Sequence, residues 1–372
     1  MTRLYLVAGE SSGDLHGANL IRALRQHDPD LECEGLGGRR MAAEGMTLHY
    51  DLAAHAIMGF SEVVKSLGLI RRLFNQSAAR LREGRPDALV LIDYPGFNMR
   101  LARFAHALGI KVIFYISPQV WAWRRGRVKT LARILDKMLV ILPFEKEIYD
   151  AAGLDCAYVG HPLLDHVAAF EPKGTFVSEM TIGLMPGSRQ QEIQRIFPIM
   201  LEVAHGLRFR YPGARFVTPC VDDDRRGQID ELAGDFPLET VVGGTYELLS
   251  AARFCLVASG TATVETLLFN VPMIVLYRTS GITYRLARRL AQVDTIAMVN
   301  ILAGRKFVPE FVQQDAVPET ILVEAAKLIE DGPERAAMTD EFERVRDMLG
   351  QGGASENAAR EIFATLGETH GG

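Results

Sequence analysis

The segment IDYPGFN, residues 92–98, places an acidic residue directly after a continuous apolar run. Asp93 ends that run, and Pro95 with Gly96 forces the chain to turn. A carboxylate at the end of a buried strand can take a proton from an attacking hydroxyl, which is the role of a general base. An aspartate before Pro and Gly is also a common cap of a turn. The residues alone leave both interpretations of Asp93 open.

A second group of acids and bases follows the first apolar run of the chain, in the stretch AGESSGDLHGANL, residues 8–20. In parallel α/β sheets, ligands bind beyond the carboxyl ends of the strands, so we expect this stretch to share one rim with Asp93. His16 is a candidate base or orienting group, and a loop histidine held by an ordinary hydrogen bond is the simpler interpretation. The candidate side chains of the stretch are Glu10, Ser12, Asp14 and His16.

Two loops in the second half pass from an apolar run through glycine and hydroxyl residues into a helical pattern. They are LMPGSRQQEI, residues 184–193, and ASGTATVE, residues 258–265. Glycine allows close approach of the backbone, and free amides at a helix start attract phosphate oxygens. We predict a diphosphate site here and assign Glu265 to the hydroxyls of a ribose. Helix capping by Ser and Thr explains either loop alone equally well. The predicted diphosphate contacts are Ser188, Arg189, Thr261, Ala262 and Thr263.

The only two tryptophans of the chain lie on either side of one alanine in YISPQVWAWRRGR, residues 115–127. Successive side chains of an extended segment point to opposite sides, so at most one of Trp121 and Trp123 can face a core. Indoles suit a surface that is half apolar and half wet, and Arg124 and Arg125 suit a phosphate. Packing of both indoles against neighbouring loops is the alternative.

Residues 57–82 have apolar side chains at helical spacing, a pattern typical of a helix packed on a core. Basic residues flank this stripe, and two leucines lie off it. Such a basic amphipathic helix can also meet anionic lipid headgroups. We predict membrane contact, with a wholly buried helix as the alternative. The predicted membrane residues are Leu69, Arg71, Arg72 and Leu73.

Short aliphatic runs alternate with helical patterns along the whole chain, which predicts an α/β fold with parallel sheets. With 372 residues, two domains are expected. We place the boundary at the start of FEPKGTFVS, which gives domains 1–169 and 170–344, with a C-terminal helix at about 345–372 that packs back on the first. The predicted strands are LYLVAG, ALVLID, KVIFYIS and KMLVIL in the first half, and MTIGLMPG, ARFVTPC, LETVVG, FCLVASG and PMIVLYR in the second.

The composition excludes several classes of protein. A net charge of −5 argues against nucleic-acid binding through bulk positive charge. The four cysteines are scattered, which indicates neither a zinc site nor a disulfide framework and suggests a reducing cytosol. No apolar run reaches the roughly 20 residues of a membrane span. The acidic run Asp222 to Asp224 is interpreted as a helix start, so neither a metal nor another cofactor is expected.

Nine motifs, in order from residue 8 to about 305, together resemble the lipid-A-disaccharide synthase family. They are AGESSGDLHGA, MGFSEVV, IDYPGFN, YISPQVWAWR, ILPFEKEIY, YVGHPLLD, MPGSRQQEI, SGTATVET and NILAGR. The resemblance implies an inverting glycosyltransferase with two facing Rossmann-like domains of the GT-B type around an interdomain cleft. It favours Asp93 as the base and adds Asn300 as a weaker UDP contact.

The reaction that the resemblance implies moves a diacylglucosamine from UDP-2,3-diacylglucosamine to 2,3-diacylglucosamine 1-phosphate. The products would be UDP and a tetraacyl disaccharide 1-phosphate, the precursor of lipid A. The expected location is the cytoplasm, with peripheral attachment to the inner membrane. Two alternatives remain open: another GT-B enzyme acting on UDP-sugars, such as an epimerase or a peptidoglycan glycosyltransferase, and a non-catalytic nucleotide-sugar binder at the membrane.

Overall fold

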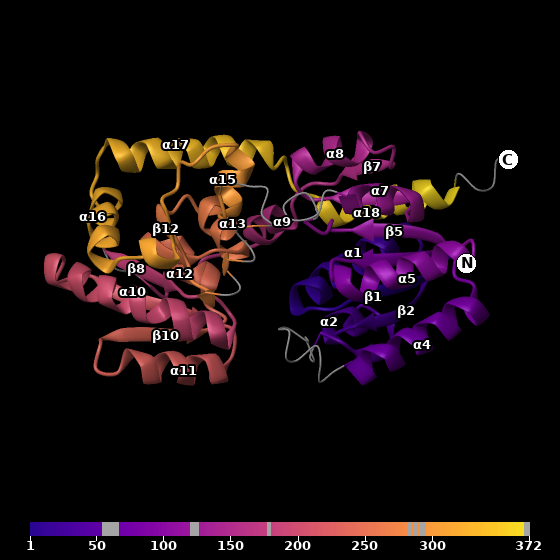
Figure 1. The fold of residues 1–372 in the computed structure, drawn as a ribbon, viewed down its shortest axis with the longest axis horizontal. Helices are drawn as coiled ribbons and strands as arrows, with labels where there is room; N and C mark the ends of the chain where they lie inside the picture. Colours follow the sequence, from indigo (N-terminus) through magenta and orange to yellow (C-terminus); the bar gives the residue numbers. More distant parts are fainter. Residues whose placement is uncertain are drawn as a thin grey trace. The chain divides into compact units, whose positions relative to one another are not determined.

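The computed structural model describes residues 1–53, 67–119, 126–176, 180–281, 284–285, 289 and 295–367. The chain divides into two compact units, Met1–Pro162 with Gln351–Gly372 (unit 1) and Leu163–Gly350 (unit 2). Each unit has one sheet in which the paired strands run parallel, with helices packed on it (Figure 1). The prediction of an α/β fold with parallel sheets is confirmed.

Unit 1 contains a seven-stranded sheet. Its strands are β1 (Arg3–Ala8), β2 (Glu32–Gly37), β3 (Thr47–Asp51), β4 (Ala88–Ile92), β5 (Lys111–Tyr115), β6 (Lys137–Val140) and β7 (Cys156–Tyr158). Its helices are α1 (Ser11–His27), α2 (Arg39–Ala43), α4 (Leu67–Gly84), α5 (Pro95–Ala107), α7 (Gly126–Ile134), α8 (Pro143–Asp150) and α18 (Ala354–Gly367), and α9 (Pro162–Ala168) begins at the boundary between the units.

Unit 2 contains a six-stranded sheet. Its strands are β8 (Thr181–Met185), β9 (Arg215–Cys220), β10 (Leu238–Val242), β11 (Ala252–Ala258), β12 (Met273–Tyr277) and β13 (Glu310–Val312). Its helices are α10 (Gln190–Arg210), α11 (Asp223–Ala233), α12 (Thr245–Ala251), α13 (Thr261–Leu268), α15 (Met298–Ala303), α16 (Pro318–Ile329) and α17 (Pro333–Met348), with a 3₁₀ turn, η1, at Gln313–Asp315.

Strand order reverses once in each sheet. In unit 1 the order is β3-β2-β1-β4-β5-β6-β7, and in unit 2 it is β10-β9-β8-β11-β12-β13. The chain therefore leaves β1 toward one edge and returns to pair β4 on its other side, and it does the same with β8 and β11. In open parallel sheets, ligands bind beyond the strand ends at this switch point. The two switch points are the places where a site is expected.

The core of unit 1 has one layer on each face of its sheet. Along β1, Tyr5 and Val7 belong to one buried cluster, while Leu4 and Leu6 belong to the other. This alternation follows from the two-residue period of a strand. The first cluster packs residues of α4, α5 and α7, and the second packs residues of α1 and α18. Both faces of β1 and β4 are therefore buried, which fixes where their carboxyl ends lie.

The last helix, α18, belongs to unit 1 although it follows unit 2 in the chain. Ala358 and Ile362 are part of the same buried cluster as β1, and Glu356 pairs with His27 of α1 at 2.6 Å. Glu361 also pairs with Lys137 of β6 at 2.8 Å. Among the helices that the structure describes, none is long and apolar enough to cross a membrane.

Candidate functional site

The switch point of unit 1 brings together the loops that follow β1 and β4. These strands pair in register from Leu4 with Ala88 to Ala8 with Ile92, so both end at the same level. Glu10 stands at the start of α1, directly beyond β1, and Asp93 stands directly beyond β4. The charge of Glu10 acts on the Asp93 carboxyl across this point. The first predicted loop and IDYPGFN therefore meet at one place.

The backbone at Asp93 adopts an unusual conformation. Asp93 and Tyr94 have φ angles of 45° and 48°, two successive non-glycine residues in the left-handed region. Ile116, in the loop after the neighbouring strand β5, has a φ of 65°. For a β-branched residue this is a true outlier. Such positions cost of order 1–3 kcal/mol each and occur where the surrounding structure over-determines them, often at functional sites.

Asp93 is half-buried, and its surroundings disfavour the ionised form. Burial and the nearby Glu10 carboxylate raise the pKa of the Asp93 carboxyl to about 6. A hydrogen bond from a backbone amide opposes this shift. A base is most effective when its pKa lies near the working pH, so this environment makes Asp93 a better proton acceptor than an exposed aspartate.

The other candidates of the first loop lie in different environments. Ser12 is exposed and His16 is half-buried, both on α1. Asp14 is buried, and its carboxylate accepts the backbone amides of Arg40 and Met41 at 3.1 and 3.0 Å. Those amides belong to the first turn of α2, so Asp14 acts as a cap for a helix distant in sequence. Its oxygens already have partners inside the fold, which favours a structural role for Asp14.

The switch point of unit 2 brings together the two loops predicted to bind a diphosphate. β8 and β11 pair as neighbours, and α10 and α13 begin just beyond their ends. Helix α10 follows Gly187, whose φ is 100°, and α13 follows Gly260, whose φ is 156°. Free amides at two helix starts on one rim suit the oxygens of a diphosphate. Ser188, Arg189 and Thr261 are exposed there, Ala262 is half-buried, and Thr263 is buried.

The first turn of α10 carries a small charged group. Arg189 donates from Nη1 to Oε1 of Glu192 at 3.0 Å. The charges of Arg189, Arg195 and Glu192 all influence the pKa of Tyr277, which lies at the end of β12. Burial raises the pKa of the Tyr277 hydroxyl. An anion bound at this turn would compete with Glu192 for the Arg189 guanidinium.

The α13 loop shows which groups are already engaged. The Thr263 hydroxyl donates to the Gly260 carbonyl at 2.8 Å, so this hydrogen bond stabilises the turn at the start of α13. Glu265 shares a hydrogen bond with the Tyr246 hydroxyl, and burial raises the pKa of its carboxyl. Tyr246 packs edge-on to Phe170 at 5.6 Å between ring centroids. Glu265 is therefore held in a defined orientation before any ligand binds.

Asn300 is fully used inside unit 2. Its side chain is 1% exposed, and Nδ2 donates to the Val308 carbonyl and to Oε1 of Glu310. Its Oδ1 accepts the amides of Phe307 and Val308, both at 3.0 Å. An asparagine amide has two donors and two acceptor positions, and all four are occupied. Asn300 lies on α15 and its partners follow that helix, so this geometry favours a role in positioning the segment between α15 and β13 over direct contact with UDP.

The burial of side chains on helix α4 bears on the prediction that this segment contacts a membrane. Leu73 is 2% exposed and belongs to the core of unit 1, and Leu69 packs against that core. The assignment of Leu73 to a membrane surface is therefore wrong, because its side chain already lies inside the protein. Arg71 and Arg72 are exposed, as is Leu67 at 53%.

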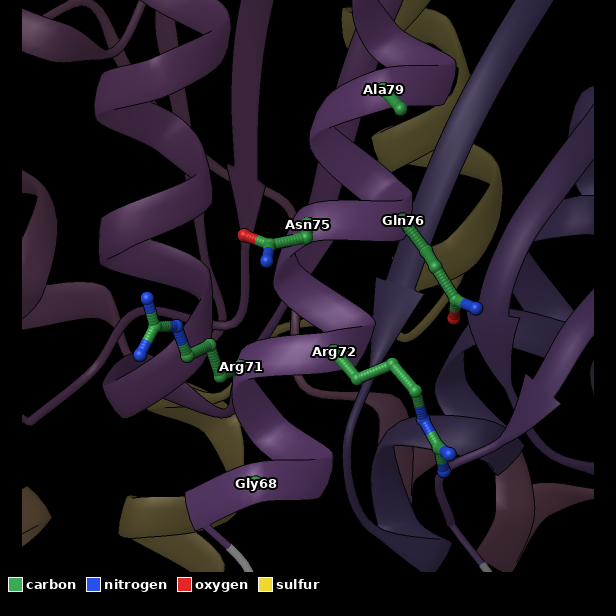
Figure 2. Close-up of a pocket in the computed structure, with 6 residues that line it drawn as sticks. All are labelled: Gly68, Arg71, Arg72, Asn75, Gln76 and Ala79. Carbon is green, nitrogen blue, oxygen red and sulfur yellow. The ribbon is translucent and has the colours of Figure 1, made fainter.

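The exposed side of α4 lines an open hollow of ≈ 470 Å³. Arg71 and Asn75 point to one side of the helix, while Arg72 and Gln76 point to the other (Figure 2). Gly68 and Ala79 also line the hollow. Arg71 and Arg72, the two arginines predicted to contact the membrane, therefore lie on an accessible surface.

Other predicted residues divide between those the structure describes and those it does not. The residues Trp121, Trp123, Arg124 and Arg125 lie outside the described residues, as does the MGFSEVV motif.

Asp222 is the N-cap of α11, where its Oδ1 accepts the Arg225 amide at 2.7 Å. The interpretation of this acidic run as a helix start is confirmed.

Two residues important to the geometry were missed by the sequence analysis. Asn98 lies within IDYPGFN and contacts the Asp93 backbone, and Tyr246 contacts Glu265. The signal for Asn98 is its place on the buried side of α5, between Phe97 and Met99. A polar residue among buried apolar ones needs partners, and strand ends supply carbonyls. No comparable pattern marks Tyr246.

Comparison with known proteins identifies the family. The family described as lipid-A-disaccharide synthetase matches residues 4–364. This chain belongs to that family. Lipid-A-disaccharide synthases of Geobacter sulfurreducens and Myxococcus xanthus are 40% and 39% identical to it, over 98% of this chain and 98% and 97% of the relatives. The chain is a glycosyltransferase, and lipid A disaccharide synthesis is favoured over the epimerase, peptidoglycan and binder alternatives.

Solved structures agree on the fold of this family member. The S. aureus MnaA co-structure with UDP has a TM-score of 0.69 at 15% identity and covers 99% of this chain and 97% of that chain. UDP-GlcNAc 2-epimerase from Neisseria meningitidis, bound to UDP-GlcNAc, has a TM-score of 0.67 at 14% identity, with 98% and 100% covered. At such identity the likeness concerns the fold alone, and it confirms the predicted GT-B class.

Proposed function

We propose that this synthetase-family chain condenses UDP-2,3-diacylglucosamine with 2,3-diacylglucosamine 1-phosphate. The products are a tetraacyl disaccharide 1-phosphate and UDP. The observation that carries this proposal is the half-buried Asp93 with its raised pKa at a switch point, in a chain that matches the family over residues 4–364. Supplying both substrates is expected to release UDP, and omitting the acceptor to release none. Equal UDP release without the acceptor would identify a hydrolase.

In the proposed chemistry Asp93 accepts the proton of the primary hydroxyl of the acceptor. The hydroxyl oxygen bonds to the anomeric carbon of the donor, and the bond from that carbon to UDP breaks. Attack from the face opposite the leaving group inverts the anomeric configuration. Removal of the proton as the new bond forms makes the alcohol a stronger nucleophile.

The leaving UDP binds unit 2 in this proposal. The amides at the starts of α10 and α13 and the Arg189 guanidinium stabilise the charge that develops on the diphosphate. Arginine suits this work because it remains charged and presents several donors in a fixed plane. Glu265, oriented by Tyr246, accepts the ribose hydroxyls. This arrangement stabilises the leaving group through the chain's own groups and needs no metal ion.

Activity is expected to fall as the pH falls through about 6, the value to which burial and Glu10 raise the Asp93 pKa. The ionised carboxylate is the active form, so the acid limb of kcat/KM should follow this group. Stability should move the other way, because a folded-state pKa above the ordinary value of about 3.9 favours folding at low pH. A pH profile of kcat/KM tests this, and an acid limb near 4 would contradict it.

We also propose that the exposed side of α4 contacts anionic lipid at the inner membrane, on the cytoplasmic side. Arg71 and Arg72 are exposed on this side, beside the exposed Leu67. Each basic group near an anionic surface contributes about 1 kcal/mol, so attachment is weak and reversible. The whole-chain charge of −5 opposes this only weakly, because fields are screened beyond about 8 Å at physiological ionic strength.

Charge reversal at Arg71 and Arg72 to Glu is expected to weaken binding to anionic vesicles by about tenfold or more. The matched control reverses Arg100 and Arg103, two exposed arginines of the neighbouring helix α5. Cosedimentation with phosphatidylglycerol vesicles at several salt concentrations measures the effect. Affinity for UDP should stay unchanged in both variants. Equal binding by both variants and the parent would remove α4 from the lipid-facing surface.

A further inference from the structure

The turn that carries Asp93 is held by the buried side-chain amide of Asn98, a residue of α5. Asn98 is 0% exposed, and its Nδ2 lies 2.7 Å from the Asp93 carbonyl. The same nitrogen lies 3.4 Å from the Ile92 carbonyl and 3.5 Å from the Val7 carbonyl. These carbonyls belong to the ends of β4 and β1 and to the residue between β4 and α5. One side chain therefore joins both strands of the switch point to the turn.

The same turn is also confined by close contact with a glycine. A Cβ added to Gly9 would lie 2.1 Å from Cγ of the Tyr94 ring. No side chain fits at that distance, so the Tyr94 ring rests directly on the Gly9 backbone. The amide of Asp93 also donates to the Tyr115 carbonyl at 3.1 Å. The left-handed residues Asp93 and Tyr94 are thus held by several contacts at once.

We propose that Asn98 is a positioning residue for the transfer reaction, and that with Gly9 it holds the Asp93 carboxylate at the place where the acceptor hydroxyl must lose its proton. This proposal rests on the proposed function, because it takes Asp93 as the base. It also accounts for the strained backbone, because without these contacts Asp93 and Tyr94 would relax toward ordinary conformations. The carboxylate would then leave its half-buried place beside Glu10.

The expected effect of Asn98→Ala is a fall in kcat of about 10- to 100-fold, because a misplacement of about 1 Å can cost about that much. The KM for each substrate should change less than about twofold, since neither substrate is bound by Asn98. The acid limb of kcat/KM should also shift from about 6 toward lower pH, because a relaxed Asp93 is better solvated. The titratable groups on the elements around it are Glu10, Asp14, His16, Tyr94 and Tyr115.

A matched control separates positioning from general stabilisation. Asn357 is another asparagine of unit 1 whose Nδ2 donates to a carbonyl, that of Val159, at 3.0 Å. Asn357→Ala should lower the melting temperature but leave the acid limb and kcat at the parent values. Gly9→Ala supplies an independent variant, because it displaces Tyr94 without changing Asn98, and it should reproduce the Asn98→Ala signature even where that variant folds poorly.

The outcomes are distinct. Loss of kcat together with a lowered acid limb, in Asn98→Ala or Gly9→Ala but not in Asn357→Ala, supports the proposal. An acid limb unchanged from the parent in Asn98→Ala and Gly9→Ala overturns it, whatever the loss of stability. If Asp93→Asn itself retains activity, the proposed function fails at the base. If Asp93→Asn is inactive while Asn98→Ala keeps the parent's kcat and pH profile, only the positioning role fails.

Discussion

Replacement of Asp93 by asparagine is expected to reduce kcat by about 100- to 10,000-fold, the usual cost of removing a general base. The amide keeps the size and shape of the carboxylate, so the turn at Asp93 and Tyr94 should remain folded. An amide has no basic oxygen to take the acceptor proton. UDP affinity should be unchanged, because the proposed UDP contacts lie on unit 2. Steady-state kinetics and titration with UDP measure both parts.

The control for this prediction is Asp87→Asn. Asp87 precedes β4 at the end opposite Asp93, and its Oδ2 accepts the Arg3 amide at 2.8 Å. The chemical change is the same, but the site is exposed and distant from the switch point. It should leave kcat near the parent value. If Asp93→Asn also turned over at near the parent rate, Glu10 would become the next candidate base, and Glu10→Gln would test it.

Glu265→Ala is expected to weaken UDP binding by about 10- to 100-fold, because hydrogen bonds to charged groups contribute about 1.5–3 kcal/mol. The loss should be specific to the ribose, so affinity for pyrophosphate should change much less. Glu319→Ala provides the control, since it removes an exposed carboxylate from α16 of the same unit. Calorimetric titrations with UDP and pyrophosphate compare the variants. Equal weakening of both ligands by Glu265→Ala would refute the ribose assignment.

Much of the fold follows from patterns that survive in the sequence. The nine predicted strands correspond to β1, β4, β5, β6, β8, β9, β10, β11 and β12. All of these except the edge strand β10 have a neighbouring strand on both sides. The missed strands are β2, β3, β7 and β13. β2 reads ECEGLG, with two glycines and two glutamates, and β13 has only three residues at a sheet edge. Their pairing depends on neighbouring strands, which local propensity does not register.

The error at Leu73 has a specific cause. The buried side of α4 is formed by Leu73, Ser77, Ala78 and Leu81, so a serine lies in the middle of an apolar face. Ser77 is buried because its hydroxyl accepts the Tyr5 hydroxyl at 3.0 Å. When the buried face of α4 is predicted from apolar residues alone, Ser77 is assigned to the exposed side. The predicted face then moves away from Ser77 and no longer includes Leu73. Only the tertiary partner of the serine reveals the correct face.

The chemistry of the site could be predicted in part from residue types and their positions. Strand-end positions indicated Asp93 and the two glycine loops, because parallel sheets gather their carboxyl ends at one rim. The left-handed backbone at Asp93 and Tyr94 was not predictable, because tyrosine does not favour that conformation and aspartate adopts it in only a minority of cases. The contact between the Asn98 amide and the Asp93 carbonyl depends on the tertiary fold, so it was not predictable either. Residue type makes Asp14 a candidate acid or base of the site, and the family resemblance makes Asn300 a candidate UDP contact. The structure shows the polar atoms of both engaged within the fold.

The most direct test of the account is the structure of the lipid product. Purified protein would be incubated with α-linked UDP-2,3-diacylglucosamine and 2,3-diacylglucosamine 1-phosphate, and the lipid fraction analysed by mass spectrometry and NMR. The account predicts a tetraacyl disaccharide 1-phosphate whose new linkage has the inverted, β configuration. A retained α linkage, or recovery of only the two monosaccharide lipids, would contradict it.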